Sequence, residues 1–137
     1  MGRVLGIDYG TVRVGIAMSD PMRIISSPHA TIPYKSDKAL VKDILDLMKE
    51  YDADEIVLGH PMGLSGNKTK KTEEVEKFCE MLRSTGVIVH LVDESFTSEE
   101  AKKIMHKMKK KSGHNKEMVD MIAASLILKD YLNSIKF

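Results

Sequence analysis

Three acidic residues stand where a carboxylate is hard to explain as ordinary surface charge. Asp8 lies in the segment GIDYGT near the N-terminus, directly after a run of apolar residues. A second acid, Asp93 or Glu94, follows another apolar segment, and Asp120 interrupts an apolar run close to the C-terminus. Carboxylates gathered from separate elements are the hard oxygen ligands that Mg²⁺ and Mn²⁺ prefer.

The first two positions each have a simpler explanation when taken alone. Asp8 lies in a predicted strand that should be central in its sheet, where unpaired carboxylates are avoided. Asp8 can equally open the turn that follows, as Asp often does. Asp93 and Glu94 follow the carboxyl end of a strand, where open α/β sheets place ligands, and either of them can equally be a loop charge. Because neighbouring strand residues point to opposite faces, only one of these two acids can face a site directly.

Asp120 is the most informative acid because its helix is apolar on nearly every side, which indicates that the helix is buried. Its place near the helix N-terminus contributes about 0.3–1 kcal/mol. That is small against the several kcal/mol that desolvation of a charge costs. A bound cation is therefore the more natural explanation. The alternative is an ion pair with Lys116, which lies four residues earlier on the same helical face.

Together, these carboxylates predict a site for Mg²⁺ or Mn²⁺ built from the first strand, the end of a later strand and the last helix. Two such ions can activate a water molecule and stabilise the leaving oxygen of a phosphodiester. The predicted chemistry is hydrolysis of a nucleic-acid backbone.

The net charge of +1 conceals a strongly basic segment. Residues 101–116 hold seven lysines and no acid, which leaves 14 basic against 20 acidic residues, or about −6, in the rest of the chain. Such a segment can hold a polyanion, and a solvated helix face explains it equally well. The residues that we predict to contact nucleic acid are Arg13, Lys68, Lys102, Lys103, Lys109, Lys110 and Lys116.

The hydrophobic pattern predicts five strands and four helices. The strands are expected at 4–9, 13–18, between 23 and 32, at 55–59 and at 87–92. The first helix is expected from an N-cap at Ser36 to residue 51, and the second around 75–82 with a stop at Gly86. The third is expected from a capping box at Thr97 and Glu100 to about 108, and the fourth over 116–134.

The predicted order of elements is therefore βββαβαβαα. Three hairpin-linked strands followed by crossover units predict a mixed five-stranded sheet with helices on both faces, an α/β fold of the ribonuclease H-like type. The chain of 137 residues has room for one such core, so we predict a single domain over residues 1–137.

Four segments in this order resemble the motifs of the YqgF family, also called RuvX, over essentially the whole chain. GIDYGT with RVGIA resembles the opening motif, VLGHP with Gly66 resembles a loop motif, and DESFTS resembles the central acidic motif. The closing motif is matched by Lys116, Asp120 and the apolar residues that follow them.

This resemblance implies a metal-dependent endonuclease that acts on structured nucleic acid and matures the 5′ end of pre-16S rRNA. The catalytic acids and metal ligands of the family fall on Asp8, Glu94 and Asp120, which selects Glu94 over Asp93. The resemblance leaves a four-way DNA junction open as the alternative substrate. Arg13 and Lys116 are our candidates for contact with a phosphate of the substrate.

Two residues depart from the family pattern. Ser95 stands where the family usually has arginine, and His60 stands where it usually has leucine. Loss of the arginine removes a bidentate phosphate contact. A non-catalytic nucleic-acid-binding regulatory module is therefore a further alternative.

Other classes of protein fit the sequence less well. ATPases that share the Asp-x-Gly-Thr turn close two domains around the nucleotide, and this chain has the length for one. The single Cys79 and the five histidines show no zinc-ligand spacing. No apolar run is long enough to span a membrane, and the lone cysteine without a secretory segment favours the cytoplasm. The sequence is compatible with a monomer or a homodimer.

Overall fold

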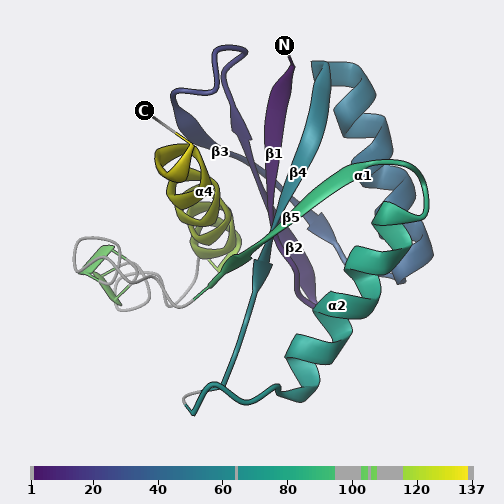
Figure 1. The fold of residues 1–137 in the computed structure, drawn as a ribbon, viewed down its shortest axis with the longest axis vertical. Coiled ribbons are helices and arrows are strands. Elements are labelled where there is room, and N and C mark those ends of the chain that lie inside the picture. The colour runs from purple at the N-terminus through teal and green to yellow at the C-terminus, as the bar shows by residue number, and fades with distance from the viewer. Residues whose placement is uncertain (1, 64, 95–102, 105, 108–115, 136–137) are drawn as a thin grey trace.

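A five-stranded mixed sheet with helices on both faces forms the fold. The computed structural model describes residues 2–63, 65–94, 103–104, 106–107 and 116–135. The elements are β1 (Arg3–Asp8), β2 (Arg13–Ser19), β3 (Ser26–Pro33), α1 (Asp37–Tyr51), β4 (Ala53–His60), α2 (Lys70–Arg83), β5 (Ile88–Asp93) and α4 (Lys116–Ser134). Figure 1 shows α4 on one face of the sheet and α1 with α2 on the other.

The strand order β3-β2-β1-β4-β5 places β1 in the centre. β1 pairs antiparallel with β2 and parallel with β4, and β4 pairs parallel with β5. The carboxyl ends of β1, β4 and β5 therefore lie at the same end of the sheet, toward the bottom of Figure 1. The predicted α/β fold, a mixed five-stranded sheet with helices on both faces, is confirmed by this architecture.

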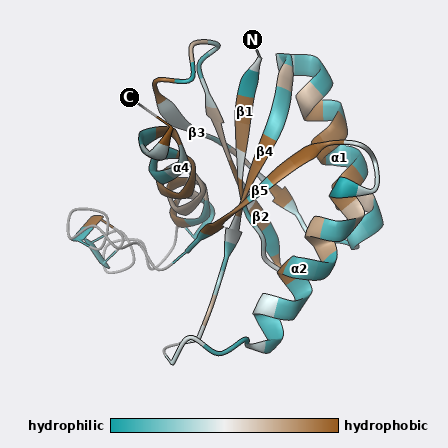
Figure 2. Cartoon of the chain, viewed as in Figure 1, coloured by the Kyte–Doolittle hydropathy of each residue, from teal (hydrophilic) through white to brown (hydrophobic). Residues whose placement is uncertain are grey.

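Both faces of the central strands are buried, which explains why their sequences are almost continuously apolar. Side chains of one alternating set, such as Ile7 and Leu58, pack in the core beneath α1 and α2. The other set, which includes Val57, packs against Ile127 and Leu128 of α4. Figure 2 shows the resulting concentration of hydrophobic residues along α4.

The boundaries differ from prediction mainly in two places. The third strand, expected between 23 and 32, begins only at Ser26, because the turn before it contains Arg23 in the left-handed conformation, at φ 58°. The helix expected after Thr97 lies for the most part outside the described residues, although 103–104 and 106–107 are helical. The expected N-cap is confirmed, since Ser36 Oγ accepts a hydrogen bond from the Ala39 N–H at 3.1 Å.

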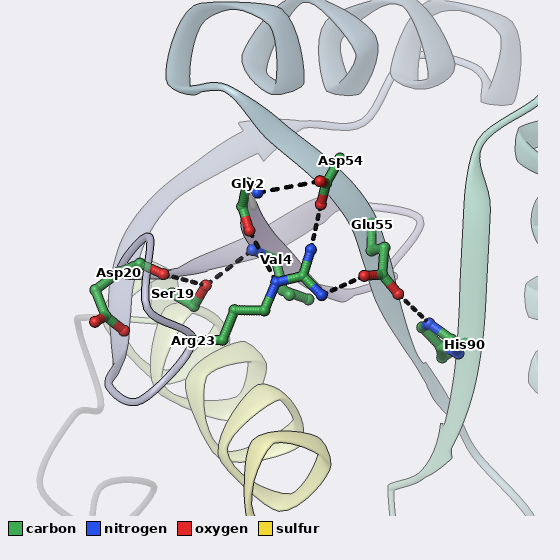
Figure 3. A network of polar contacts seen from close by, with 8 residues as sticks. All are labelled: Gly2, Val4, Ser19, Asp20, Arg23, Asp54, Glu55 and His90. Atoms are coloured by element: carbon green, nitrogen blue, oxygen red, sulfur yellow. Dashed lines mark hydrogen bonds and ion pairs between the residues drawn. The ribbon is translucent and has the colours of Figure 1, made fainter. Parts of the chain in front are cut away.

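Arg23 ties the opposite end of the sheet together (Figure 3). Its Nε donates to the carbonyl of Gly2 at 2.8 Å, and its guanidinium forms ion pairs with Asp54 and Glu55 at the start of β4. Glu55 in turn contacts Nε2 of His90 on β5 at 2.7 Å. One side chain from the β2–β3 turn thus connects β1 and β4 and, through Glu55, reaches β5.

We expect Arg23→Met to lower the free energy of unfolding by about 2–4 kcal/mol at pH 7, because a partly buried carboxylate loses its partner. The exposed control Lys42→Met should change it by less than about 0.5 kcal/mol. Urea unfolding measures both, and equal losses in the two variants would contradict the role of the network.

The same network makes stability depend on pH. The hydrogen bond from His90 and, after it, the Arg23 guanidinium hold the pKa of Glu55 below its ordinary value of 4.5. A carboxyl whose pKa is lowered by folding stabilises the native state above its unfolded pKa, and that contribution is lost as pH falls through the folded pKa. The stability difference between native protein and Arg23→Met should therefore shrink below pH 4.5; a difference that is constant with pH would count against this account.

Candidate active site

Asp8 lies at the centre of the end where the parallel strands terminate. It is the last residue of β1 and pairs in register with Gly15 of β2. Alternation along β1 puts its side chain on the same face as Val4, which packs against α4. Asp8 therefore points to the side of the sheet that α4 covers.

Asp120 is brought to Asp8 by a close approach between α4 and β2. A Cβ at Gly15 would lie 2.1 Å from the carbonyl oxygen of Asp120 and 3.1 Å from the Cβ of Asp120. The helix can reach this position only because residue 15 has no side chain. Gly6 allows the same approach two turns further along α4, where its Cβ would lie 2.8 Å from that of Leu128.

Glu94 reaches the same face from β5. Its N–H donates to the carbonyl of His60 at 3.3 Å, which extends the pairing of β4 with β5 by one residue. Its Oε1 lies 3.3 Å from where a Cβ at Gly59 would stand. Leu58 of β4 pairs with Ile7 of β1, so the next residues, Gly59 and Asp8, lie at the same level of the sheet. Glu94 therefore lies over β4, the strand beside Asp8. Asp93 is exposed.

Asp120 is held close to another negative charge. Burial raises its pKa above the ordinary value, and the carboxylate of Asp8 raises it further, while Arg13 opposes the shift. Nε of Arg13 lies 2.5 Å from Oδ2 of Asp120, with about a quarter of each side chain exposed. The buried Nε makes no hydrogen bond of good geometry to any described residue.

This ion pair differs from the one considered on sequence grounds. Lys116 is exposed at the start of α4, and the described partner of Asp120 is Arg13, which comes from β2. Sequence spacing could not reveal the pair because it joins residues more than one hundred positions apart. The only available signal was a basic residue at the first position of the second strand.

The donor set suits a divalent cation in chemistry and in placement. Three carboxylates come from three elements at one end of the sheet, and Gly15 and Gly59 leave the space in which two of them lie. As the side chains stand, no three His, Cys, Asp or Glu residues within the described ranges are grouped closely enough to hold an ion. Oδ2 of Asp120 instead faces Arg13.

The structure describes only some of the lysines that we predict to contact nucleic acid. Lys116 lies on α4 one turn before Asp120, and Lys103 is exposed. Lys68 lies in the β4–α2 loop, where its Nζ is 3.0 Å from Glu76, and His60 contacts the other oxygen of Glu76 at 3.0 Å. Sequence analysis missed this contact with Glu76. The other predicted contacts, Lys102, Lys109 and Lys110, lie outside the described residues, as does Ser95.

Two solved structures share the fold of this chain. The yeast mitochondrial Holliday junction resolvase matches with a TM-score of 0.61 and 13% identity, over 96% of this chain and 78% of that one. RuvC of T. thermophilus, solved in complex with a Holliday junction substrate, matches with a TM-score of 0.58 and 11% identity, over 98% and 97% of the two chains. The fold is therefore that of the ribonuclease H-like resolvases.

Sequence comparison identifies the family. Residues 2–134 match the RuvX family, described as Holliday junction resolvase, and this chain belongs to that family. A relative from Dictyoglomus thermophilum is 37% identical over 96% of each chain. Another, from Clostridium acetobutylicum, is 34% identical over 97% of this chain and 99% of its own. Both are named as candidate pre-16S rRNA nucleases, so the predicted family and nuclease class are confirmed.

None of the helices in the described part of the chain is long and apolar enough to cross a membrane.

We expect the two glycines beneath the acids to differ in their tolerance of a methyl group. Gly15→Ala drives a Cβ into the backbone of Asp120, so it should cost about 3 kcal/mol of stability or more. Gly59→Ala meets chiefly the movable Cδ1 of Ile127, at 2.7 Å, and should cost about 1 kcal/mol. Denaturant unfolding compares them, and an equal or reversed order would show that α4 does not rest on Gly15.

Proposed function

We propose that this protein is a metal-dependent endonuclease that hydrolyses phosphodiester bonds in structured nucleic acid, and that it processes the 5′ end of pre-16S rRNA. The observation that carries the proposal is the placement of Asp8, Glu94 and Asp120 from three elements on one face of the sheet. The names of the curated relatives support the RNA substrate. Such an enzyme would act in the cytoplasm, where ribosomes are assembled.

Asp8, Glu94 and Asp120 are the proposed catalytic residues and would hold Mg²⁺ or Mn²⁺. A bound divalent cation supplies activation of water and stabilisation of the leaving oxygen. The protein supplies the carboxylate oxygens and a half-buried setting in which their charge is poorly screened. Asp120 would offer Oδ2 to the cation only after that oxygen turns away from Arg13, whereas its other carboxylate oxygen could bind the cation with the pair intact.

Arg13 has a second role in this proposal. Its planar guanidinium has five N–H donors, and Nε has no hydrogen-bond partner of good geometry among the described residues. Once Asp120 takes another partner, Arg13 is placed to donate to a phosphate oxygen beside the acids. Lys116 at the start of α4 would hold the strand at the same end, together with Lys68, Lys102, Lys103, Lys109 and Lys110.

We expect Asp8→Asn to abolish cleavage of a pre-16S rRNA fragment while leaving the fold intact. Loss of one ligand removes several kcal/mol of charge stabilisation, which corresponds to a rate loss of at least about 100-fold. The control is Asp46→Asn on the exposed side of α1, which should cleave at the native rate. Undiminished cleavage by Asp8→Asn would refute the assignment.

Metal binding is tested separately from cleavage. Calorimetric titration with Mn²⁺ should show binding to the native protein and to Asp46→Asn. Asp8→Asn should bind at least about tenfold more weakly, because a charged oxygen ligand becomes a neutral amide. Equal affinity in all three proteins would contradict a metal site at Asp8.

A four-way DNA junction is the second candidate substrate, favoured by the description of the family and by the structural neighbours. Symmetrical cutting of a junction needs two sites and hence a dimer. Offering both substrates to the native protein and to Asp8→Asn, with gel filtration of the native protein, separates the two activities. Binding of either substrate without cleavage would instead favour the non-catalytic regulatory module.

A further inference from the structure

A cavity of about 350 Å³ lies between the β1–β2 turn and the start of α2. Its walls are formed by Tyr9, Gly10, Thr11, Lys70, Lys71 and Glu74. None of these residues is among the proposed metal ligands or the nucleic-acid contacts predicted from the sequence.

The cavity adjoins the acidic site through the end of β1. Tyr9 directly follows Asp8, and alternation sends its side chain to the opposite face, where it packs against Phe78 at a ring distance of 5.0 Å. The hydroxyl of Tyr9 donates to Asp37 at 2.7 Å, so this wall of the cavity is held in place. A nucleic-acid strand that passes over the β1–β2 turn would meet the proposed metal ligands on one side of the turn and the cavity on the other.

The charges of the cavity favour an anion. Lys70 and Lys71 contribute two positive charges against one negative charge from Glu74. Neither lysine forms an ion pair within the described part of the chain, in contrast to Lys68, whose Nζ lies 3.0 Å from Glu76.

The lysines, rather than the end of the helix, would provide the binding groups. The N–H of Thr72 donates to Thr69 Oγ1 at 3.2 Å, and the N–H of Thr69 donates to Thr72 Oγ1 at 3.0 Å. This capping box already uses donors of the helix start. Apart from the Tyr9 hydroxyl, which already donates to Asp37, the side-chain donors of the cavity are the Lys70 and Lys71 ammonium groups and the exposed Thr11 hydroxyl.

We propose that this cavity is a phosphate subsite in which Lys70 and Lys71 hold a backbone phosphate of the nucleic acid that is cut at the neighbouring acids. The inference rests on the proposed function, since it takes the same strand past the acids. The subsite positions the backbone and carries no sequence information, because every nucleotide presents the same phosphate. It also gives the substrate an anchor that does not depend on the metal.

The test measures binding without cleavage. A fluorescein-labelled RNA hairpin with a single-stranded 5′ flank is titrated in EDTA over a series of salt concentrations. The proteins are the native chain, Lys70→Gln/Lys71→Gln, Glu74→Gln and the control Lys77→Gln. Lys77 is exposed on α2, two helical turns after Lys70 and outside the cavity.

We expect the double variant to bind about tenfold more weakly. We also expect the slope of log K against log salt to fall by about 0.7–0.9 for each phosphate that the variant no longer neutralises. Glu74→Gln should bind more tightly, and Lys77→Gln should match the native chain. A double variant with native affinity and slope, or one no weaker than Lys77→Gln, would overturn the proposal.

A second arm distinguishes the source of the phosphate. Inorganic phosphate is titrated into the ¹⁵N-labelled native chain and double variant, and the amide signals of Gly10 and Thr11 are followed. Shifts in the native chain alone would show a site that takes any phosphate group. RNA binding that depends on the lysines without a phosphate effect would show a site specific to the polynucleotide backbone, and the absence of both effects would overturn the proposal.

Cleavage by the same proteins separates this proposal from the function on which it rests. If Asp8→Asn is inactive and the double variant binds RNA like the native chain, the nuclease stands and the subsite fails. If Asp8→Asn cleaves normally and the double variant binds weakly with a reduced salt slope, the lysines bind phosphate and the assignment of the acids fails.

Discussion

The arrangement of this protein depends on how closely one helix can approach the sheet. α4 lies against β1 and β2 at a distance that leaves no room for a Cβ at Gly6 or Gly15. Ordinary helix-on-sheet packing keeps a layer of side chains between the two backbones, and here that layer is missing at both positions. The approach buries Leu128 completely, and it also brings the backbone of Asp120 onto the strand that pairs with Asp8. The close approach of α4 to β1 and β2 therefore determines both the packing of this face of the sheet and the position of Asp120 beside Asp8.

That contact has an electrostatic cost. Asp120 loses hydration and gains Asp8 as a neighbour, and both raise its pKa. A carboxylate in this position destabilises the folded chain at neutral pH relative to a neutral side chain of the same shape. Arg13 offsets part of the cost by pairing with Asp120. At the other end of the sheet, Arg23 forms an ion pair with Glu55, whose second carboxylate oxygen contacts His90 at 2.7 Å.

Much of this could be predicted from the sequence because the signals are local. The β1–β2 hairpin follows from two apolar runs around Gly10–Thr11, and α4 follows from an apolar segment of helical length. Asp120 could be singled out as a candidate site residue for the same reason, because it is an acid within that apolar segment. The choice of Glu94 over Asp93 needed the family motif, because alternation shows only that the two acids point apart. Their placement relative to one another, by contrast, depends on register and on glycines whose close contacts no local pattern reveals.

The ion pair of Arg13 with Asp120 and the cavity beside Lys70 and Lys71 were beyond sequence reasoning for a physical reason. Each depends on two elements distant in the chain that meet only when the sheet forms, and lysine or arginine at an element boundary is otherwise typical of solvated surface. The capping box of α2 is local, but its third position is Thr72, where glutamate or glutamine is the usual signature. The result is a helix start that the sequence pattern did not place.

The pair between Arg13 and Asp120 has a consequence for the proposed metal site. A guanidinium that holds Oδ2 of Asp120 competes with a divalent cation for that oxygen, so the apparent affinity of a site that uses Oδ2 is the intrinsic affinity reduced by the fraction of molecules in which Oδ2 is released. The same pair gives the chain a partly neutralised site while it holds no metal, so its folding does not have to wait for the ion, unlike that of small domains assembled around zinc.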